Sequence, residues 1–145
     1  MSGKIERIVV YPTKGVAGIE LAEARFVEGA GLEGDFHAVG GDRQLSLLFA
    51  ESREAAGIHG EGLCLKRFKE NLSIRGLVSP DFKPGMRLSA GDALLEITGE
   101  VKHCHEECIL FKEGKRCPLS GLNLFARVVK GGLIRAGEQL RVVSL

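Results

Sequence analysis

Glycine is the feature that most limits how this chain can fold. The sequence holds 20 glycines in 145 residues, and they separate apolar runs that are only a few residues long. Because glycine adopts backbone angles closed to other residues, its frequent recurrence indicates many tight turns. Short apolar runs joined by such turns are typical of sandwiches and barrels. The sequence therefore predicts a mainly β fold, a closed or partly closed β-barrel with a few short helices, in which closure removes exposed strand edges.

The predicted strands are short and rich in β-branched and aliphatic residues. They cover residues 4–11, 19–27, 44–49, 70–76, 86–89 and 93–98, and a turn-and-strand unit over 133–143 closes the chain. A helix competes with a strand over 19–27, because Leu, Ala and Glu favour it, but Gly18 and Gly29 bracket this segment closely and favour the strand. Helices are predicted over 50–58 and around 120–125.

Two of the expected turns share a sequence pattern. Residues 88–92 and 134–138 both read Leu/Ile-x-x-Gly-Asp/Glu, and each pattern follows or ends a predicted strand. The similarity is too short for an internal repeat. It indicates that one kind of tight turn recurs in the predicted barrel.

Composition and charge exclude several classes of protein. No linker or low-complexity segment divides residues 1–145, so we predict one domain, long enough to bury a core. A formal net charge of +1 gives no bulk attraction to nucleic acid or to a membrane surface. The sequence shows no signal peptide and no membrane-spanning segment, so we expect a cytoplasmic protein. In that reducing compartment, clustered cysteines are more often catalytic or metal-binding than disulfide-bonded.

Three of the four cysteines fall within residues 101–118. They are Cys104, Cys108 and Cys117, and His105 lies beside the first of them. Nearby lysines and an arginine favour the reactive thiolate, whereas two glutamates between the first two cysteines oppose it. Thiolate and imidazole are also ligands of soft and borderline metals. The segment is therefore predicted to be a reactive-thiol site, a metal site, or both.

A glycine-rich loop over residues 29–43 is the second candidate site. Five glycines in fifteen residues exclude a long regular element. Successive amides in such a loop can form an anion-binding nest, and Gly34, Asp35, His37 and Arg43 are the candidate binding residues. A structural connector is an equally open interpretation, in which Asp35 and His37 brace a turn.

Taken together, these motifs resemble a MOSC domain, the family named for the C-terminal domain of molybdenum cofactor sulfurases. The resemblance covers nearly the whole chain and depends on the order and spacing of several short motifs. They are Gly31-Leu-Glu-Gly-Asp-Phe-His37, Arg43-Gln-Leu-Ser-Leu-Leu48, Glu70-Asn71-Leu with Gly76 behind it, residues 84–98, Cys104-His105-Glu-Glu-Cys108, Cys117, Phe125-Ala126-Arg127, and Gly131-Gly132 followed by Ala136-Gly137-Glu138. Residues 99–126 are most similar to small stand-alone members. The family has a β-barrel core, similar to the pyruvate-kinase barrel, which agrees with the fold predicted above.

The resemblance implies that the protein handles molybdenum cofactor, a pterin dithiolene that carries a phosphate and a molybdenum centre. By position, Cys108 matches the family cysteine that binds the metal or carries abstracted sulfur, with Cys104 and Cys117 as helpers. Larger members place a proline directly before that cysteine, whereas Glu107 stands here, so Cys104 and Cys117 stay alternatives for the key thiol. These 145 residues contain no aminotransferase-like sulfurase domain, so a sulfur-donor protein or a molybdoenzyme is the expected partner.

Recognition of the cofactor's anionic and pterin parts would fall to other residues. The glycine-rich loop, Arg43 and Arg127 would bind the phosphate, because a guanidinium fork suits that group better than a point charge does. Asn71 would hydrogen-bond the pterin edges, or, as a buried residue, brace a turn.

Three functions stay open at this point. The first is a sulfur carrier or a cofactor-dependent enzyme, and the sequence does not decide whether the domain turns over a substrate. The second is a module that stores or delivers molybdenum cofactor without chemistry. The third is an interaction domain stabilised by zinc, with Cys104, His105 or else His103, Cys108 and Cys117 as the four ligands.

Overall fold

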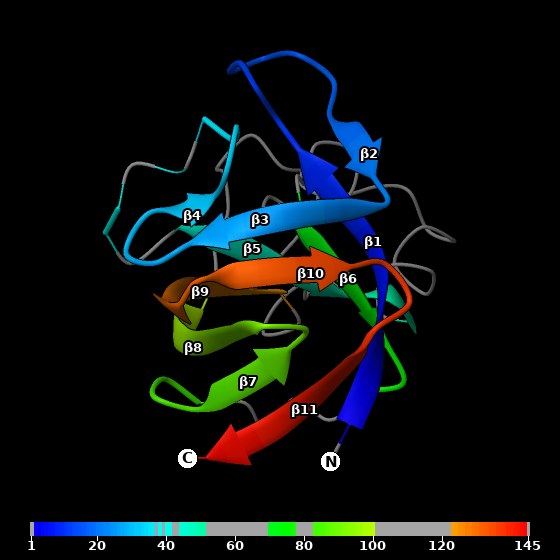
Figure 1. Ribbon diagram of the computed structural model, residues 1–145, viewed down its shortest axis with the longest axis vertical. Helices are drawn as coiled ribbons and strands as arrows, with labels where there is room; N and C mark the ends of the chain where they lie inside the picture. The colour runs from blue at the N-terminus through cyan, green and yellow to red at the C-terminus, as the bar shows by residue number, and fades with distance from the viewer. Residues whose placement is uncertain are drawn as a thin grey trace, which may run out of the picture.

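The strands of this protein form two sheets (Figure 1). The computed structural model describes residues 2–36, 38, 40–41, 44–51, 70–77, 83–100 and 123–144. Within these residues the strands are β1 (Ser2–Val10), β2 (Ile19–Leu21), β3 (Glu23–Val27), β4 (Gly31–Leu32), β5 (Leu45–Phe49), β6 (Leu72–Arg75), β7 (Arg87–Ala90), β8 (Ala93–Glu100), β9 (Asn123–Lys130), β10 (Gly132–Arg135) and β11 (Gln139–Ser144).

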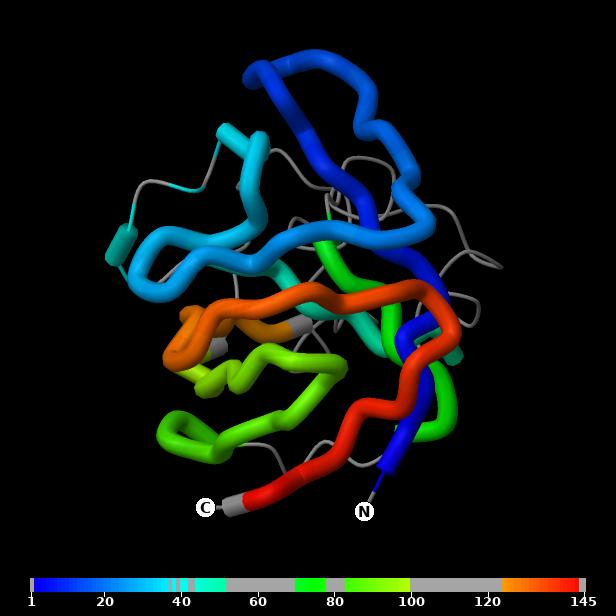
Figure 2. Tube along the Cα trace, viewed as in Figure 1, coloured from blue at the N-terminus to red at the C-terminus, as the bar shows by residue number. Residues whose placement is uncertain are grey.

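Seven of these strands close into a barrel. Their order is β11-β7-β8-β9-β5-β6-β1, and β1 also pairs with β11, which completes the ring. Among the described pairs only β5 with β6 is parallel. The pairing of Ser2 with Arg141 brings the two ends of the chain close together, as Figure 2 shows. The predicted mainly β fold and the closure of the barrel are confirmed.

Alternating side chains fill the barrel. Along β9, Leu124, Ala126 and Val128 are buried in the core, whereas Arg127 between them is exposed. This two-residue period is expected of a strand with one face on a core. In β5 all five residues are buried, which fits its nearly continuous apolar sequence.

The second sheet has the order β10-β3-β4 and packs on the same core. Ala24 and Phe26 of β3 and Ile134 of β10 belong to the core cluster, while the residues of β3 between them are exposed. Figure 1 shows β3 and β10 side by side across the near face of the molecule. The amide of Gly29, after β3, donates to the carbonyl of Val128 at 3.0 Å. The small sheet thereby fixes the start of the glycine-rich loop against β9.

The recurring turn pattern corresponds to two turns that contact each other. Gly91 and Gly137 both have positive φ, 54° and 94°, which favours glycine. The amide of Asp92 donates to the carbonyl of Leu133 at 3.1 Å. A Cβ on Gly91 would collide with the Leu133 carbonyl and with the side chain of Glu138. The turn between β7 and β8 therefore needs glycine for both its backbone angle and its close packing.

The structure corrects several of the predicted elements. The predicted helix around 120–125 is wrong for residues 123–125, because β9 begins at Asn123 and pairs with both β5 and β8. Sheet pairing there outweighs the local helix signal. The predicted strand over 19–27 is two strands, with a bend at Ala22.

One further prediction is only partly covered by the described residues, and another divides into two strands. Ala50 and Glu51 are helical, and the rest of the predicted helix over 50–58 lies outside the described residues. The predicted unit over 133–143 contains two strands, β10 and β11, joined by the turn at Gly137. In the part of the chain that the structure describes, no helix has the length and apolar character needed to cross a bilayer.

Candidate functional site

A pocket of about 460 Å³ lies between the glycine-rich loop and the outer side of β9. We call it the β9 pocket, and its lining residues are Glu28, Gly29, Gly41, Gln44, Arg127, Val128 and Val129. Its size falls in the range of pockets that hold small molecules, about 300–1,000 Å³. Because the lining combines loop backbone, an arginine and a glutamate, the pocket can offer hydrogen bonds and charge to a polar ligand.

Gln44 builds the wall of this pocket. Its side chain is buried, with 3% of the residue exposed. Its Nε2 donates to the carbonyl of Gly41 at 2.9 Å, and its Oε1 accepts from the amide of Val128, also at 2.9 Å. Gln44 thus ties the far end of the loop to β9, as the Gly29 amide ties the near end. Both polar groups of the amide are satisfied, so the wall is rigidly placed.

Arg127 supplies the positive charge of the pocket. Its Nη2 lies 2.8 Å from Oε1 of Glu96, and the second oxygen of Glu96 lies 3.2 Å from Nε of Arg87. The strand register produces this row, because Glu96 of β8 pairs with Arg87 of β7 and with Arg127 of β9. Arg127 stays 46% exposed, and Glu28 adds a negative charge to the same wall. The guanidinium fork is placed to bind an anion while part of its charge is neutralised.

Most backbone N–H groups in the described part of the glycine-rich loop donate hydrogen bonds within the protein. The amides of Gly29, Ala30, Glu33, Asp35, Phe36, Ala38 and Gly40 all donate to carbonyls of the protein. A nest needs successive amides that are free to bind an anion. Over these described residues the loop therefore works mainly as a braced connector, and the side chain of Arg127 is the better donor toward the β9 pocket.

Asp35 and Asn71 form a buried polar pair, which we call the Asp35–Asn71 brace. Asp35 Oδ1 accepts from the amide of Tyr11 at 2.7 Å and from Nδ2 of Asn71 at 3.2 Å. Asn71 Nδ2 also donates to the carbonyl of Val9 at 3.1 Å, and its Oδ1 accepts from the amide of Ser46 at 3.0 Å. Since Asn71 is 1% exposed and its amide groups are occupied, these contacts fit the turn-bracing interpretation. A direct contact of either residue with a cofactor stays a prediction.

Gly34 is, with Asp35, one of the two loop candidates that the structure describes. It is exposed and has φ of 90°, so its conformation favours glycine. The nearest atom to a Cβ built there would be a Val10 methyl carbon at 3.8 Å, so space itself would allow a side chain. The backbone angle rather than crowding explains the glycine.

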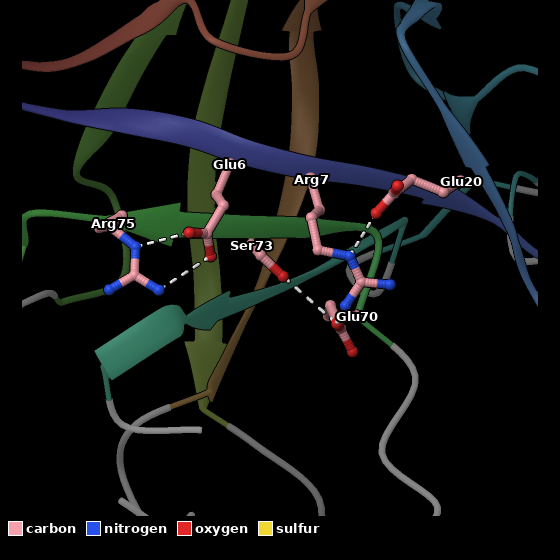
Figure 3. A network of polar contacts seen from close by, with 6 residues as sticks. All are labelled: Glu6, Arg7, Glu20, Glu70, Ser73 and Arg75. Atoms are coloured by element: carbon pink, nitrogen blue, oxygen red, sulfur yellow. Dashed lines mark hydrogen bonds and ion pairs between the residues drawn. The ribbon is translucent and has the colours of Figure 1, made fainter. Parts of the chain in front are cut away.

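Next to the brace, a row of charged side chains crosses β2, β1 and β6 (Figure 3). Arg7 contacts Glu20 at 2.5 Å and the buried carboxylate of Glu70 at 3.5 Å. The hydrogen bond that Arg7 donates to Glu20, and after it the negative charge of Glu70, raise the pKa of Arg7, so this arginine stays charged at all ordinary pH. Ser73 donates to Glu70 at 3.2 Å. These contacts hold the start of β6, and therefore Asn71, in place.

Seven predicted site residues lie outside the described residues. They are His37, Arg43, His103, Cys104, His105, Cys108 and Cys117. Their roles stay predictions. Among the described residues, no group of three or more His, Cys, Asp or Glu is arranged to hold a metal ion. Because the cysteines are outside that set, this does not test the zinc alternative.

Four polar or charged residues in and beside the pocket were not predicted as site residues from the sequence: Glu28, Gln44, Arg87 and Glu96. Gln44 had one usable signal, because it is a polar residue directly before the nearly continuous apolar run of β5. No signal in the sequence could have predicted the ionic row of Arg87, Glu96 and Arg127, since it depends on the pairing register of three strands.

The comparisons with known proteins agree with this architecture. The model of the MOSC domain family matches residues 34–141, which include most of the glycine-rich loop, the cysteine segment and β9. Among curated proteins, none matches the chain significantly.

Solved structures share the fold across nearly the whole chain. YuaD from Bacillus subtilis is 19% identical with a TM-score of 0.74, over 100% of this chain and 97% of that one. YiiM from Escherichia coli is 22% identical with a TM-score of 0.65, over 100% and 71% of the two chains. YiiM from Geobacillus stearothermophilus is 20% identical with a TM-score of 0.65, over 97% and 75%. The family match and this shared barrel together show that the chain belongs to the MOSC domain family, which is linked to molybdenum cofactor biology in general.

Proposed function

We propose that this protein binds molybdenum cofactor, or a related sulfur-bearing ligand, and carries sulfur on Cys108. The observation that carries the proposal is the β9 pocket, which presents Arg127 on the strand that directly follows the cysteine segment. The family supplies the link to molybdenum cofactor biology. In this proposal the pocket receives the phosphate end of the ligand, and the cysteine segment receives the metal or sulfur end.

The lengths of the chain segments that join them allow the β9 pocket and the cysteine segment to act on one ligand. Arg127 is four residues from Asn123, where β9 begins, which is about 13 Å at 3.3 Å per residue. Cys108 is eight residues beyond Glu100, the end of β8, and eight residues span at most about 29 Å. Since Glu100 pairs with Leu124 at the start of β9, the chain length permits Cys108 to act near the pocket.

The described residues fit the anionic part of this cofactor. Arg127 would pair with the phosphate, and Gln44 would hold the wall against which the ligand packs. When bound, the cofactor would supply a molybdenum centre whose sulfur ligand can be exchanged. Glu28 and Glu96 keep the site from being strongly cationic, which weakens binding of the phosphate and so favours its release.

In this proposal Cys108 carries out the sulfur chemistry. The Cys108 thiolate attacks the terminal sulfur of a persulfide on a donor protein. A new sulfur–sulfur bond forms on Cys108, the donor's own bond breaks, and the donor leaves as its thiolate. A second thiol, Cys104 or Cys117, then attacks the inner sulfur of this persulfide and releases the terminal sulfur as hydrosulfide. The disulfide that remains is reduced by a cellular dithiol.

The test compares protein purified without oxygen as wild type, Cys108→Ala and Cys64→Ala, where Cys64 is the one cysteine outside residues 101–118. Cyanide-labile sulfur, molybdenum and zinc are measured on each. The proposal expects labile sulfur in the wild type and in Cys64→Ala, the control that also removes one thiol, and its loss in Cys108→Ala alone.

The other outcomes decide between the remaining functions. Labile sulfur that persists in Cys108→Ala would move the key thiol to Cys104 or Cys117. Molybdenum retained without labile sulfur would favour storage or delivery. Stoichiometric zinc whose removal unfolds the protein would establish the zinc-stabilised domain instead.

A further inference from the structure

The row of Arg87, Glu96 and Arg127 offers a way to regulate the β9 pocket. Glu96 uses a different oxygen for each arginine, Oε1 for Arg127 and Oε2 for Arg87. Its side chain is only 16% exposed, whereas the two arginines are 46% and 42% exposed. The carboxylate is therefore the fixed centre of the row, and the arginines lie at its two more solvent-exposed ends.

Only Arg127 of this row lines the pocket. Its contact with Glu96 uses one terminal nitrogen, and a guanidinium has five N–H donors. An anion in the pocket can thus bind Arg127 without displacing Glu96. The negative charge of Glu96 still opposes that anion, and Arg87 offsets part of this opposition because it shares the same carboxylate.

We propose that Glu96 and Arg87 set the affinity of an anion subsite formed by Arg127 in the β9 pocket, and that its ligand class is a phosphate, free or esterified. Glu96 weakens binding so that the anion can leave, and Arg87 offsets part of this weakening. The inference deepens the proposed function, since it concerns the pocket assigned there to the ligand's phosphate. It assigns Glu96 and Arg87 as positioning and tuning residues, neither of which touches the ligand.

The test is a titration of the full-length protein with inorganic phosphate at low ionic strength, followed by the amide NMR signals of Gly29, Gly41 and Val129. In the wild type these pocket amides shift on binding. Glu96→Gln lowers the dissociation constant about threefold, and Arg87→Gln raises it about threefold, as expected for partly exposed charges. Arg127→Gln raises it about tenfold or more.

A matched ion pair separates a local effect from a change in total charge. Arg135 and Glu23 form a cross-strand pair at 3.2 Å on β10 and β3, and neither lines the β9 pocket. Glu23→Gln and Arg135→Gln change the net charge as the two tuning variants do, and they leave phosphate binding as in the wild type. The dispersion of each amide spectrum shows that the variant is folded.

The possible results decide the matter. Pocket amides that ignore phosphate in the wild type, weaker binding in Glu96→Gln, or control variants that reproduce the changes would each overturn the inference. Guanosine 5′-monophosphate as a second probe distinguishes an esterified from a free phosphate, because tighter binding than inorganic phosphate indicates contacts beyond the anion. If the wild type carries no labile sulfur while the phosphate dissociation constants of the wild type and the variants keep the expected order, the proposed function is overturned and this inference stands.

Discussion

The Asp35–Asn71 brace and the β9 pocket both contain residues that the sequence marked as cofactor contacts, yet they differ in how their polar groups are used. In the brace, Asn71 is 1% exposed and both ends of its amide are bonded to the protein. In the pocket, Arg127 is 46% exposed and shares one carboxylate with a second arginine. A buried group whose hydrogen bonds are complete stabilises the fold, whereas a half-exposed cation with spare donors can bind a ligand.

The largest effect on stability is expected from the brace. Asn71→Ala removes three side-chain hydrogen bonds and leaves the Val9 carbonyl and the Ser46 amide buried without their partner. We expect the free energy of unfolding to fall by about 3 kcal/mol, as measured by urea denaturation. Gln139→Ala, at an exposed position of β11, is the control. A loss under about 1 kcal/mol would mean that the brace is not a stabilising element.

Substitution of Gln44 should lower both the stability of the protein and its phosphate binding. Gln44→Ala removes the bonds that tie Gly41 and Val128 together, so we expect about 2 kcal/mol lower stability and loss of the phosphate-induced shifts. Denaturation and the amide titration measure the two effects on the same sample. If the pocket amides still responded to phosphate as in the wild type, Gln44 would not be the wall that holds the loop.

A smaller effect is expected when the charge of the brace is removed and its shape is kept. Asp35→Asn retains an acceptor for the Tyr11 amide but loses the charge that strengthens this bond. We expect unfolding to become easier by about 1 kcal/mol in urea, with phosphate binding unchanged. A change in phosphate affinity with stability unaltered would place Asp35 with the ligand-binding residues instead.

The smallest effect on stability is expected at Arg127. Its pair with Glu96 is partly exposed, so Arg127→Gln should change the free energy of unfolding by less than about 0.5 kcal/mol. The same variant should lose most of its phosphate binding. Destabilisation comparable to that of Asn71→Ala would remove the contrast between the two regions, because Arg127 would then also be structural.

Much of the barrel could be predicted because its signals are local. Strands β1, β5, β6, β7 and β8 follow from short apolar runs between glycines and polar turn residues, and the two Gly-Asp/Glu turns follow from their shared pattern. The failure at residues 123–125 has the opposite cause. The start of β9 is held by pairing with β5 and β8, which are distant in the sequence, and local propensity cannot report such contacts.

The sequence by itself determined the class of fold, the MOSC resemblance and the residues able to do chemistry, because residue type, spacing and glycine placement are properties of the chain alone. Only the tertiary structure decided how the described candidates are used. It buried Asn71 among backbone groups of β1 and β5 and the side chain of Asp35, and it set Arg127 beside Glu96 through the register of β8 and β9. Burial and register arise from contacts between distant segments, so they exist only once the barrel has closed.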